Sequence, residues 1–133
     1  MRRELIIQDE PIDEGALIAK SDRSLGIGAV VRFSGVVREM EGPDRLVAID
    51  YEAFDAMARR QFEHIFDEVA GKWPIESARL VHRIGRVEVG EPSLWVELNA
   101  PHRQEAFDAL AYLIDEMKKR VPIWKHPEIR ATA

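Results

Sequence analysis

The sequence predicts an α+β protein with two long helices and a mixed or antiparallel sheet, from three observations. Apolar residues recur at helical spacing in two segments, residues 55–73 and 102–120. Short stretches rich in β-branched residues, bounded by glycine and proline, lie around these segments. The predicted strands are grouped between the helices and do not alternate regularly with them, which favours α+β over a parallel α/β sheet.

The N-terminal part predicts mostly strands. We expect a short strand at residues 4–8 and a short helix at residues 11–21, with proline near its start. Residues 26–37 are rich in β-branched residues and glycine, which predicts a strand pair or one long bent strand with glycines at the bends. The Gly-Pro step within residues 39–44 predicts a loop, and the alternation in residues 45–53 predicts another strand.

The two long helices are predicted by their apolar stripes and by their ends. Asp55 can cap the first helix, and a glycine and a proline end it. The second helix stops before Pro122, because the residue before proline avoids the helical conformation. The expected buried residues are Phe62, Ile65, Phe66 and Val69 in the first helix and Ala106, Leu110, Leu113, Ile114 and Met117 in the second.

The remaining strands lie between and after the long helices. Ile123-Trp124-Lys125 should leave the second helix in an extended conformation. An antiparallel set of strands, joined by glycine-containing turns, is expected at residues 77–84, 87–89 and 93–99.

The chain has 133 residues, which predicts one domain covering residues 1–133.

Composition limits the functions that the chain can have. A net charge of −5 means that the overall charge of the chain does not favour nucleic-acid binding. No apolar run is long enough to span a bilayer, and the basic start is not followed by a secretory signal, so we expect a cytoplasmic protein. The chain has no cysteine, which excludes a cysteine nucleophile and agrees with a reducing compartment. If the protein handles sulfur, the sulfur must arrive on another molecule.

A basic segment near the C-terminus is the first candidate site. Residues 118–125 hold four cations and no carboxylate within an acidic chain, a distribution that suits a small anionic ligand. Because the chain turns back at Pro122, the amines of Lys118 and Lys125 can face one pocket and act as nucleophile, general acid or anion clamp. On spacing alone, a solvated cationic helix end is the commoner explanation.

Three more cationic residues are candidate anion-binding groups, although each alone is more often a surface residue. His102 and Arg103 open the second long helix, where free amides favour an anion and a cation is electrostatically misplaced. Arg38 enters the loop after a predicted strand. Arg103 and Lys118 are about 22 Å apart along one helix, so one protomer cannot bring both to one small ligand. A two-fold dimer can bring them together.

Other motifs in the sequence predict neither a metal nor a cofactor. His64 and His82 have no partner at metal-ligand spacing, so structural or surface roles are expected for both. The glycines form neither a P-loop nor a dinucleotide-binding motif.

Five sequence blocks, taken in order, resemble one known family. Over about residues 28–125 they are similar to the catalytic (large) subunit of molybdopterin synthase, the MoaE family, and the ordered set is far more specific than any one block. The blocks are Gly28–Arg38, Tyr51-Glu52-Ala53-Phe54 with Met57-Ala58, His82-Arg83-Ile84-Gly85 with Val89-Gly90-Glu91, Ala100-Pro101-His102-Arg103 with Ala106-Phe107, and Lys118–Lys125.

This resemblance implies a fold, a reaction and partners. The fold would be of the α/β-hammerhead type, and two large subunits would form a central homodimer. Each would bind a small ubiquitin-like sulfur-carrier subunit, which gives a heterotetramer. The carrier's C-terminal glycine thiocarboxylate would enter the pocket and convert cyclic pyranopterin monophosphate into molybdopterin with its dithiolene.

The resemblance also implies roles for the candidate residues. Lys118 and Lys125 would be catalytic, and Arg38, His102 and Arg103 would bind substrate, the last two from the neighbouring protomer. Arginine forks and ammonium groups suit a cyclic phosphate. Lys118 can polarise the glycyl carbonyl, assist addition at the pterin or form a transient covalent link, and these alternatives stay open. Relatives carry a longer tail after the Trp-Lys pair, so its contribution should be missing here or replaced, for example by residues 127–133 with Arg130.

Two other functions are compatible with the sequence. One is a non-catalytic dimer that binds a ubiquitin-like carrier, which the short tail favours and the retained lysines argue against. The other is a basic-pocket module for a different phosphorylated metabolite, with the likeness confined to the fold.

Overall fold

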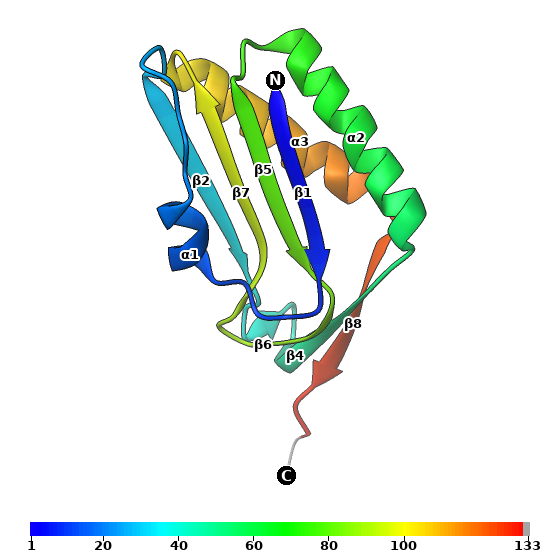
Figure 1. Ribbon diagram of the computed structural model, residues 1–133. Helices are drawn as coiled ribbons and strands as arrows, with labels where there is room; N and C mark the ends of the chain where they lie inside the picture. The colour runs from blue at the N-terminus through cyan, green and yellow to red at the C-terminus, as the bar shows by residue number, and fades with distance from the viewer. Residues whose placement is uncertain (132–133) are drawn as a thin grey trace.

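Two long helices pack on one face of a four-stranded sheet (Figure 1). The computed structural model describes residues 1–131. Across the sheet, the strands run in the order β1 (Arg2–Gln8), β5 (Ser77–Arg83), β7 (Pro92–Ala100) and β2 (Ala29–Val36). β1 pairs with β5 in parallel, whereas the β5–β7 and β7–β2 pairs are antiparallel. The prediction of an α+β protein with a mixed sheet is therefore confirmed.

A second, smaller group of strands surrounds β4 beyond one end of the main sheet (Figure 1). All three partners of β4 pair with it in the antiparallel sense. The strands are β3 (Met40–Glu41), β4 (Asp44–Ala53), β6 (Gly85–Glu88) and β8 (Ile123–Ile129).

Two details of this group correct the sequence predictions. The segment 87–89 does not join one antiparallel set with its neighbours in sequence, because Gly85 at φ +81° turns the chain away from β5 and β6 pairs with β4 instead. The predicted loop at residues 39–44 is a tight hairpin, in which Gly42 at φ +58° adopts the left-handed conformation that glycine tolerates.

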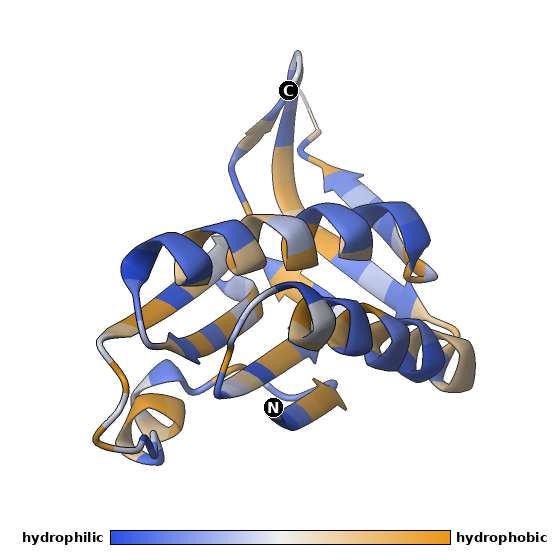
Figure 2. Cartoon of the chain, turned by 90° about the horizontal axis from the view of Figure 1, so that it is seen from above, coloured by the Kyte–Doolittle hydropathy of each residue, from blue (hydrophilic) through white to orange (hydrophobic). Residues whose placement is uncertain are grey.

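The core lies between the main sheet and the helices α2 (Asp55–Lys72) and α3 (Arg103–Arg120). Figure 2 shows hydrophobic and hydrophilic residues alternating along these helices, as expected for helices with one buried face. Both helices begin and end within one or two residues of the predicted positions. Phe54, not Asp55, occupies the cap position of α2. Asp55 is the first residue of the helix, and its carboxylate accepts a hydrogen bond from Arg59 Nε at 2.8 Å. The buried core residues of the helices are Ala58, Phe62, Ile65, Phe66, Val69, Ala106, Ala109, Leu113 and Met117.

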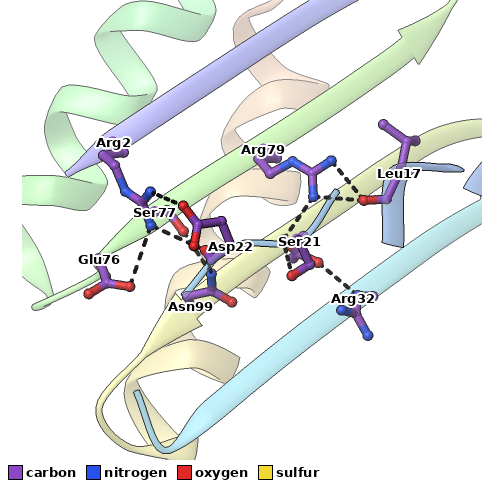
Figure 3. Close-up of polar contacts among 10 residues, drawn as sticks. Arg2, Leu17, Ser21, Asp22, Arg32, Glu76, Ser77, Arg79 and Asn99 are labelled. Atoms are coloured by element: carbon purple, nitrogen blue, oxygen red, sulfur yellow. Dashed lines mark hydrogen bonds and ion pairs between the residues drawn. The ribbon is translucent and has the colours of Figure 1, made fainter. Parts of the chain in front are cut away.

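Part of the opposite face of the sheet, on the side of β2 and β7, is covered by α1 (Glu14–Ala19) and the segment that follows it (Figure 1). Here the buried carboxylate of Glu97 on β7 binds two guanidinium groups, Arg32 Nε at 2.8 Å and Arg79 Nη1 at 3.1 Å. Arg79 also donates to the Leu17 carbonyl at 2.9 Å, which fastens α1 to the sheet (Figure 3). Because both faces of β7 are covered, almost every residue of that strand is buried.

Gly28 marks a close approach between two parts of the chain. A Cβ atom at this position would lie 2.3 Å from the Pro101 carbonyl oxygen, and the Gly28 amide donates to Ala100 O at 3.1 Å. This glycine therefore allows the start of β2 to pass against the segment that leads into α3, in addition to permitting a bend. Across residues 1–131, no helix combines the length and the apolar character needed to cross a bilayer.

Candidate active site

A cavity of about 690 Å³ opens where α3 ends, between the end of β2 and the β4–β8 pair. Its size is that of a small-molecule site. Three cations line it, namely Arg38 just after β2, Lys118 in the last turn of α3 and Lys125 on β8. Within the part of the chain that the structure describes, no carboxylate is among the lining residues. The cavity therefore attracts an anion and offers donors to it.

The turn after α3 brings the two lysines together. Val121 is extended, at φ −83° and ψ 124°, as a residue before proline must be, and its amide still donates to Met117 O at 3.0 Å. The chain then reverses into β8, which pairs with β4 so that Lys125 lies directly opposite Tyr51. Side chains of directly opposed residues lie on the same face of a sheet, which sends Lys125 to the wall that Tyr51 also forms.

The other two cations of residues 118–125 point away from the cavity. Lys119 is 71% exposed, and its Nζ lies 3.4 Å from a Glu116 carboxylate oxygen. Arg120 reaches across to α2 and donates to both oxygens of Glu68, at 2.7 and 2.8 Å, while the Tyr112 hydroxyl donates to the same carboxylate. Hydrogen bonds from Arg120 and Tyr112 lower the pKa of Glu68 to about 2. Arg120 therefore fixes the last turn of α3 against α2, and Lys118 extends from that fixed turn.

His102 and Arg103 are at the opposite end of α3 and do not line the cavity. Both are exposed, and His102 is the cap residue of the helix without a side-chain capping bond. His102 Nδ1 lies 3.6 Å from a Glu105 carboxylate oxygen. The helix keeps the pair about 22 Å from Lys118. Of the five predicted site residues, the structure brings three into one cavity and leaves these two on a separate surface.

The cavity wall also contains polar residues that sequence reasoning did not select. Tyr51 Oη donates to Ser93 Oγ at 3.2 Å, and Ser93 Oγ donates to the Gly35 carbonyl at 3.3 Å. Burial raises the pKa of Tyr51, which keeps its proton in place. The sequence carried no strong signal for these two residues, because both strands also contain other polar side chains, such as Asp50 in β4 and Glu97 in β7.

His82 is the other missed residue of the wall. It is only 5% exposed, at the end of β5, and its ring meets the Tyr51 ring edge-on at 5.4 Å between centroids. Its Nδ1 lies 2.8 Å from the Arg83 carbonyl oxygen. Burial, aided by the charge of Lys125, lowers the pKa of His82 and keeps the ring neutral. Among residues 1–131, neither this histidine nor any other joins a group of three or more side chains suited to a metal ion.

Comparison with known proteins identifies the family. The model of the family described as "MoaE protein" matches residues 7–120. Curated molybdopterin synthase catalytic subunits from Pyrococcus abyssi and Bacillus subtilis are 41% and 37% identical to this chain. The matches cover 89% of this chain and 78% of the Pyrococcus protein, and 90% of this chain and 75% of the Bacillus protein.

Solved structures share the fold. The crystal structure of molybdopterin synthase from Staphylococcus aureus superposes with a TM-score of 0.84 at 33% identity, covering 97% of this chain and 92% of that one. A chain from the complex of subunits 1 and 2 of molybdopterin-converting factor from Helicobacter pylori has a TM-score of 0.74 at 20% identity, covering 98% and 86%, and supports the fold alone. The chain therefore belongs to the MoaE family, the catalytic subunits of molybdopterin synthase.

Proposed function

We propose that this chain carries out sulfur transfer in the cavity at the end of α3, from the C-terminal thiocarboxylate of a small ubiquitin-like carrier to cyclic pyranopterin monophosphate. The product is the dithiolene of molybdopterin. The observation that carries this proposal is the convergence of Arg38, Lys118 and Lys125 on one cavity whose described lining holds no carboxylate.

The charge of the cavity suits both reactants. The cyclic phosphate and the thiocarboxylate are anions, and three uncompensated cations lower the free energy of bringing them together. Arg38 supplies a planar fork for phosphate oxygens, whereas the ammonium groups of Lys118 and Lys125 act as mobile point donors. The chain has no cysteine, so the sulfur is supplied by the carrier.

Lys118 and Lys125 are the proposed catalytic residues. Both can donate to an oxygen that gains negative charge when a nucleophile adds to the glycyl carbonyl, which is the usual way in which fixed cations stabilise acyl-transfer transition states. A transient covalent link through the Lys118 amine is the alternative. Lys118 is the more rigidly held of the two, because its helical turn is tied to α2 through Arg120 and Glu68.

His102 and Arg103 can complete the same site only from a second copy. Within one protomer they lie about 22 Å from Lys118 along α3. A two-fold dimer that places the start of one α3 near the end of the other supplies them in trans. We propose this arrangement, with one carrier bound to each copy. The cysteine-free composition suits the cytoplasmic location that we also propose.

Product formation by the Lys118→Ala variant tests the proposed function. Wild-type protein is incubated with cyclic pyranopterin monophosphate and a thiocarboxylated carrier, and dithiolene product is measured. We expect product from the wild type and a loss of at least about 100-fold in the variant, the scale of removing one transition-state donor. Lys119→Ala is the matched control, because Lys119 is the adjacent lysine on the same helix but is exposed and outside the cavity.

Each outcome has a definite meaning. Equal loss in both lysine variants would assign the effect to the helix end in general and not to the cavity. Carrier binding without product from the wild type would contradict catalysis and favour a non-catalytic carrier-binding dimer. Product from the pterin without any dependence on the carrier would favour a different sulfur source.

A further inference from the structure

His82 is held in the cavity wall in one orientation. Its Nδ1 lies 2.8 Å from the Arg83 carbonyl oxygen, and the Tyr51 ring supports one edge of the imidazole. A carbonyl oxygen can only accept a hydrogen bond, so Nδ1 carries the proton. Because the ring is neutral, Nε2 then carries a free lone pair.

This lone pair opens on the cavity. His82 is a lining residue, and within residues 1–131 no side chain or backbone group makes a hydrogen bond to Nε2. Nε2 is not sealed from solvent, in contrast to Arg83 Nε, which is buried without a hydrogen-bond partner. The free nitrogen is therefore reachable from the cavity even though most of the ring is buried.

The other titratable groups around His82 cannot accept a proton readily. Arg38 beyond β2, Lys118 on α3 and Lys125 on β8 are cations and offer only donors. The Tyr51 hydroxyl on β4 donates to Ser93, and no described carboxylate lines the cavity. His82 Nε2 is consequently the basic nitrogen that this cavity offers when its lysines are charged.

We propose that His82 is the general base of this cavity, which takes a proton from the water that hydrolyses a thioester formed between the carrier and the pterin. The inference rests on the proposed sulfur transfer and deepens it. A thiocarboxylate sulfur that has bonded to the pterin is still bonded to the glycyl carbonyl carbon. That second bond must be cut by water to leave the sulfur behind.

The step balances with water as the only co-reactant. The water oxygen forms a bond to the glycyl carbon, and its first proton passes to His82 Nε2. The carbon–sulfur bond then breaks, so that the pair of electrons leaves with sulfur as a thiolate on the pterin. The carrier is released with a carboxylate, and the second proton of the water goes to solvent. Lys118 or Lys125 donates to the glycyl carbonyl oxygen, which is negatively charged after the water has added and before the carbon–sulfur bond breaks.

The His82→Asn variant separates this chemical role from a structural one. The asparagine amide can still donate to the Arg83 carbonyl, as Nδ1 does, but it has no basic nitrogen at the Nε2 position. Wild type and variant are each mixed with pterin substrate and thiocarboxylated carrier, first with the pterin in excess and then with the carrier in excess. The intact mass of the denatured carrier is followed with time. His64→Asn is the matched control, because His64 is exposed on α2 and outside the cavity.

In His82→Asn we expect the covalent carrier–pterin species to accumulate, and release of free carrier to slow by about 100-fold or more, the usual contribution of a general base. His64→Asn should behave as wild type. The wild-type rate of release should fall as pH is lowered and His82 becomes protonated, because a protonated imidazole cannot accept the proton. His82→Asn should lose this acidic limb.

Several results would overturn the inference. Release at the wild-type rate in His82→Asn excludes the base, and so does equal slowing of adduct formation and release without accumulation. If His82→Asn does not fold, judged by its melting temperature, a wild-type release rate that is independent of pH contradicts the proposal without any variant. A wild type that makes no product refutes the proposed function itself, whereas a wild type that turns over beside an unimpaired His82→Asn refutes only the role of His82.

Discussion

Cationic side chains lie on both faces of the main sheet, in opposite electrostatic settings. On the α1 face, Arg32 and Arg79 are bound by Glu97, which is only 1% exposed. On the helix face, at the end of α3, Lys118 and Lys125 line a cavity to which no described carboxylate contributes. The charges of Arg32 and Arg79 are balanced by a carboxylate of the same chain. Those of Lys118 and Lys125 are balanced only when an anion binds.

The difference shows that the position of the carboxylate, more than the number of cations, separates a structural cluster from a binding site. A buried charge without a partner costs several kcal/mol, so a fold retains cations near its interior only with a carboxylate beside them or with access to solvent and ligand. Glu97 gives the first solution, and the open cavity gives the second.

Glu97→Ala should have the largest effect on stability. The substitution leaves Arg32 and Arg79 without their shared carboxylate under α1, and breaking a buried pair in this way costs about 3–5 kcal/mol of unfolding free energy. Urea denaturation measures this loss. Glu4→Ala, at an exposed position of β1, should change the unfolding free energy by less than about 0.5 kcal/mol. A similar small change in both variants would contradict the structural role of Glu97.

Glu68→Gln should have a smaller effect that depends on pH. The pKa of Glu68 is lowered to about 2 from an ordinary value of 4.5, so its stabilising contribution is fully present above the ordinary value and disappears as pH falls through the folded one. The melting temperature of the variant should be below that of wild type near neutral pH. The two melting temperatures should converge as pH approaches about 2. A pH-independent difference would show that packing, not the ion pair with Arg120, holds the end of α3.

Lys118→Met and Lys125→Met should have the smallest effect on stability, because no carboxylate loses a partner. The free energy of unfolding of both variants should lie within about 0.5 kcal/mol of the wild-type value, or slightly above it if the lysines repel each other. The same variants should lose sulfur transfer, so stability and activity are measured on one preparation. A loss of several kcal/mol would indicate that the lysines are structural, like the arginines under α1.

Parts of the fold with a strong periodic signal were predictable from the sequence. Both long helices are present, because their apolar stripes match the helical period over 18 residues each. The turn after α3 followed from Pro122, which is why the meeting of Lys118 and Lys125 in one pocket was also predictable. Arg38 was found from its place at a strand end.

Other parts depend on pairing between distant segments, which local patterns do not reveal. β8 continues to Ile129, past the predicted extended segment 123–125, because β4 supplies hydrogen bonds that offset the exposed and proline-containing sequence. His82 was assigned a structural or surface role, since alternation indicates which face a residue is on but not that the end of the strand opens on a cavity. His102 and Arg103 cannot be placed in the site from one protomer at all.

The pairing of β8 with β4 has a consequence for local opening. Beyond its first residue, β8 is exposed along its length, and its backbone hydrogen bonds go to one neighbour. Segments with few buried apolar side chains open at a lower free energy than the core to which they are attached. Lys125 can therefore leave the cavity wall while Lys118 stays fixed in its helix. Lys118 and Lys125 therefore lie on segments that open locally at different rates. Backbone amide hydrogen exchange should be slow around Lys118 and fast around Lys125.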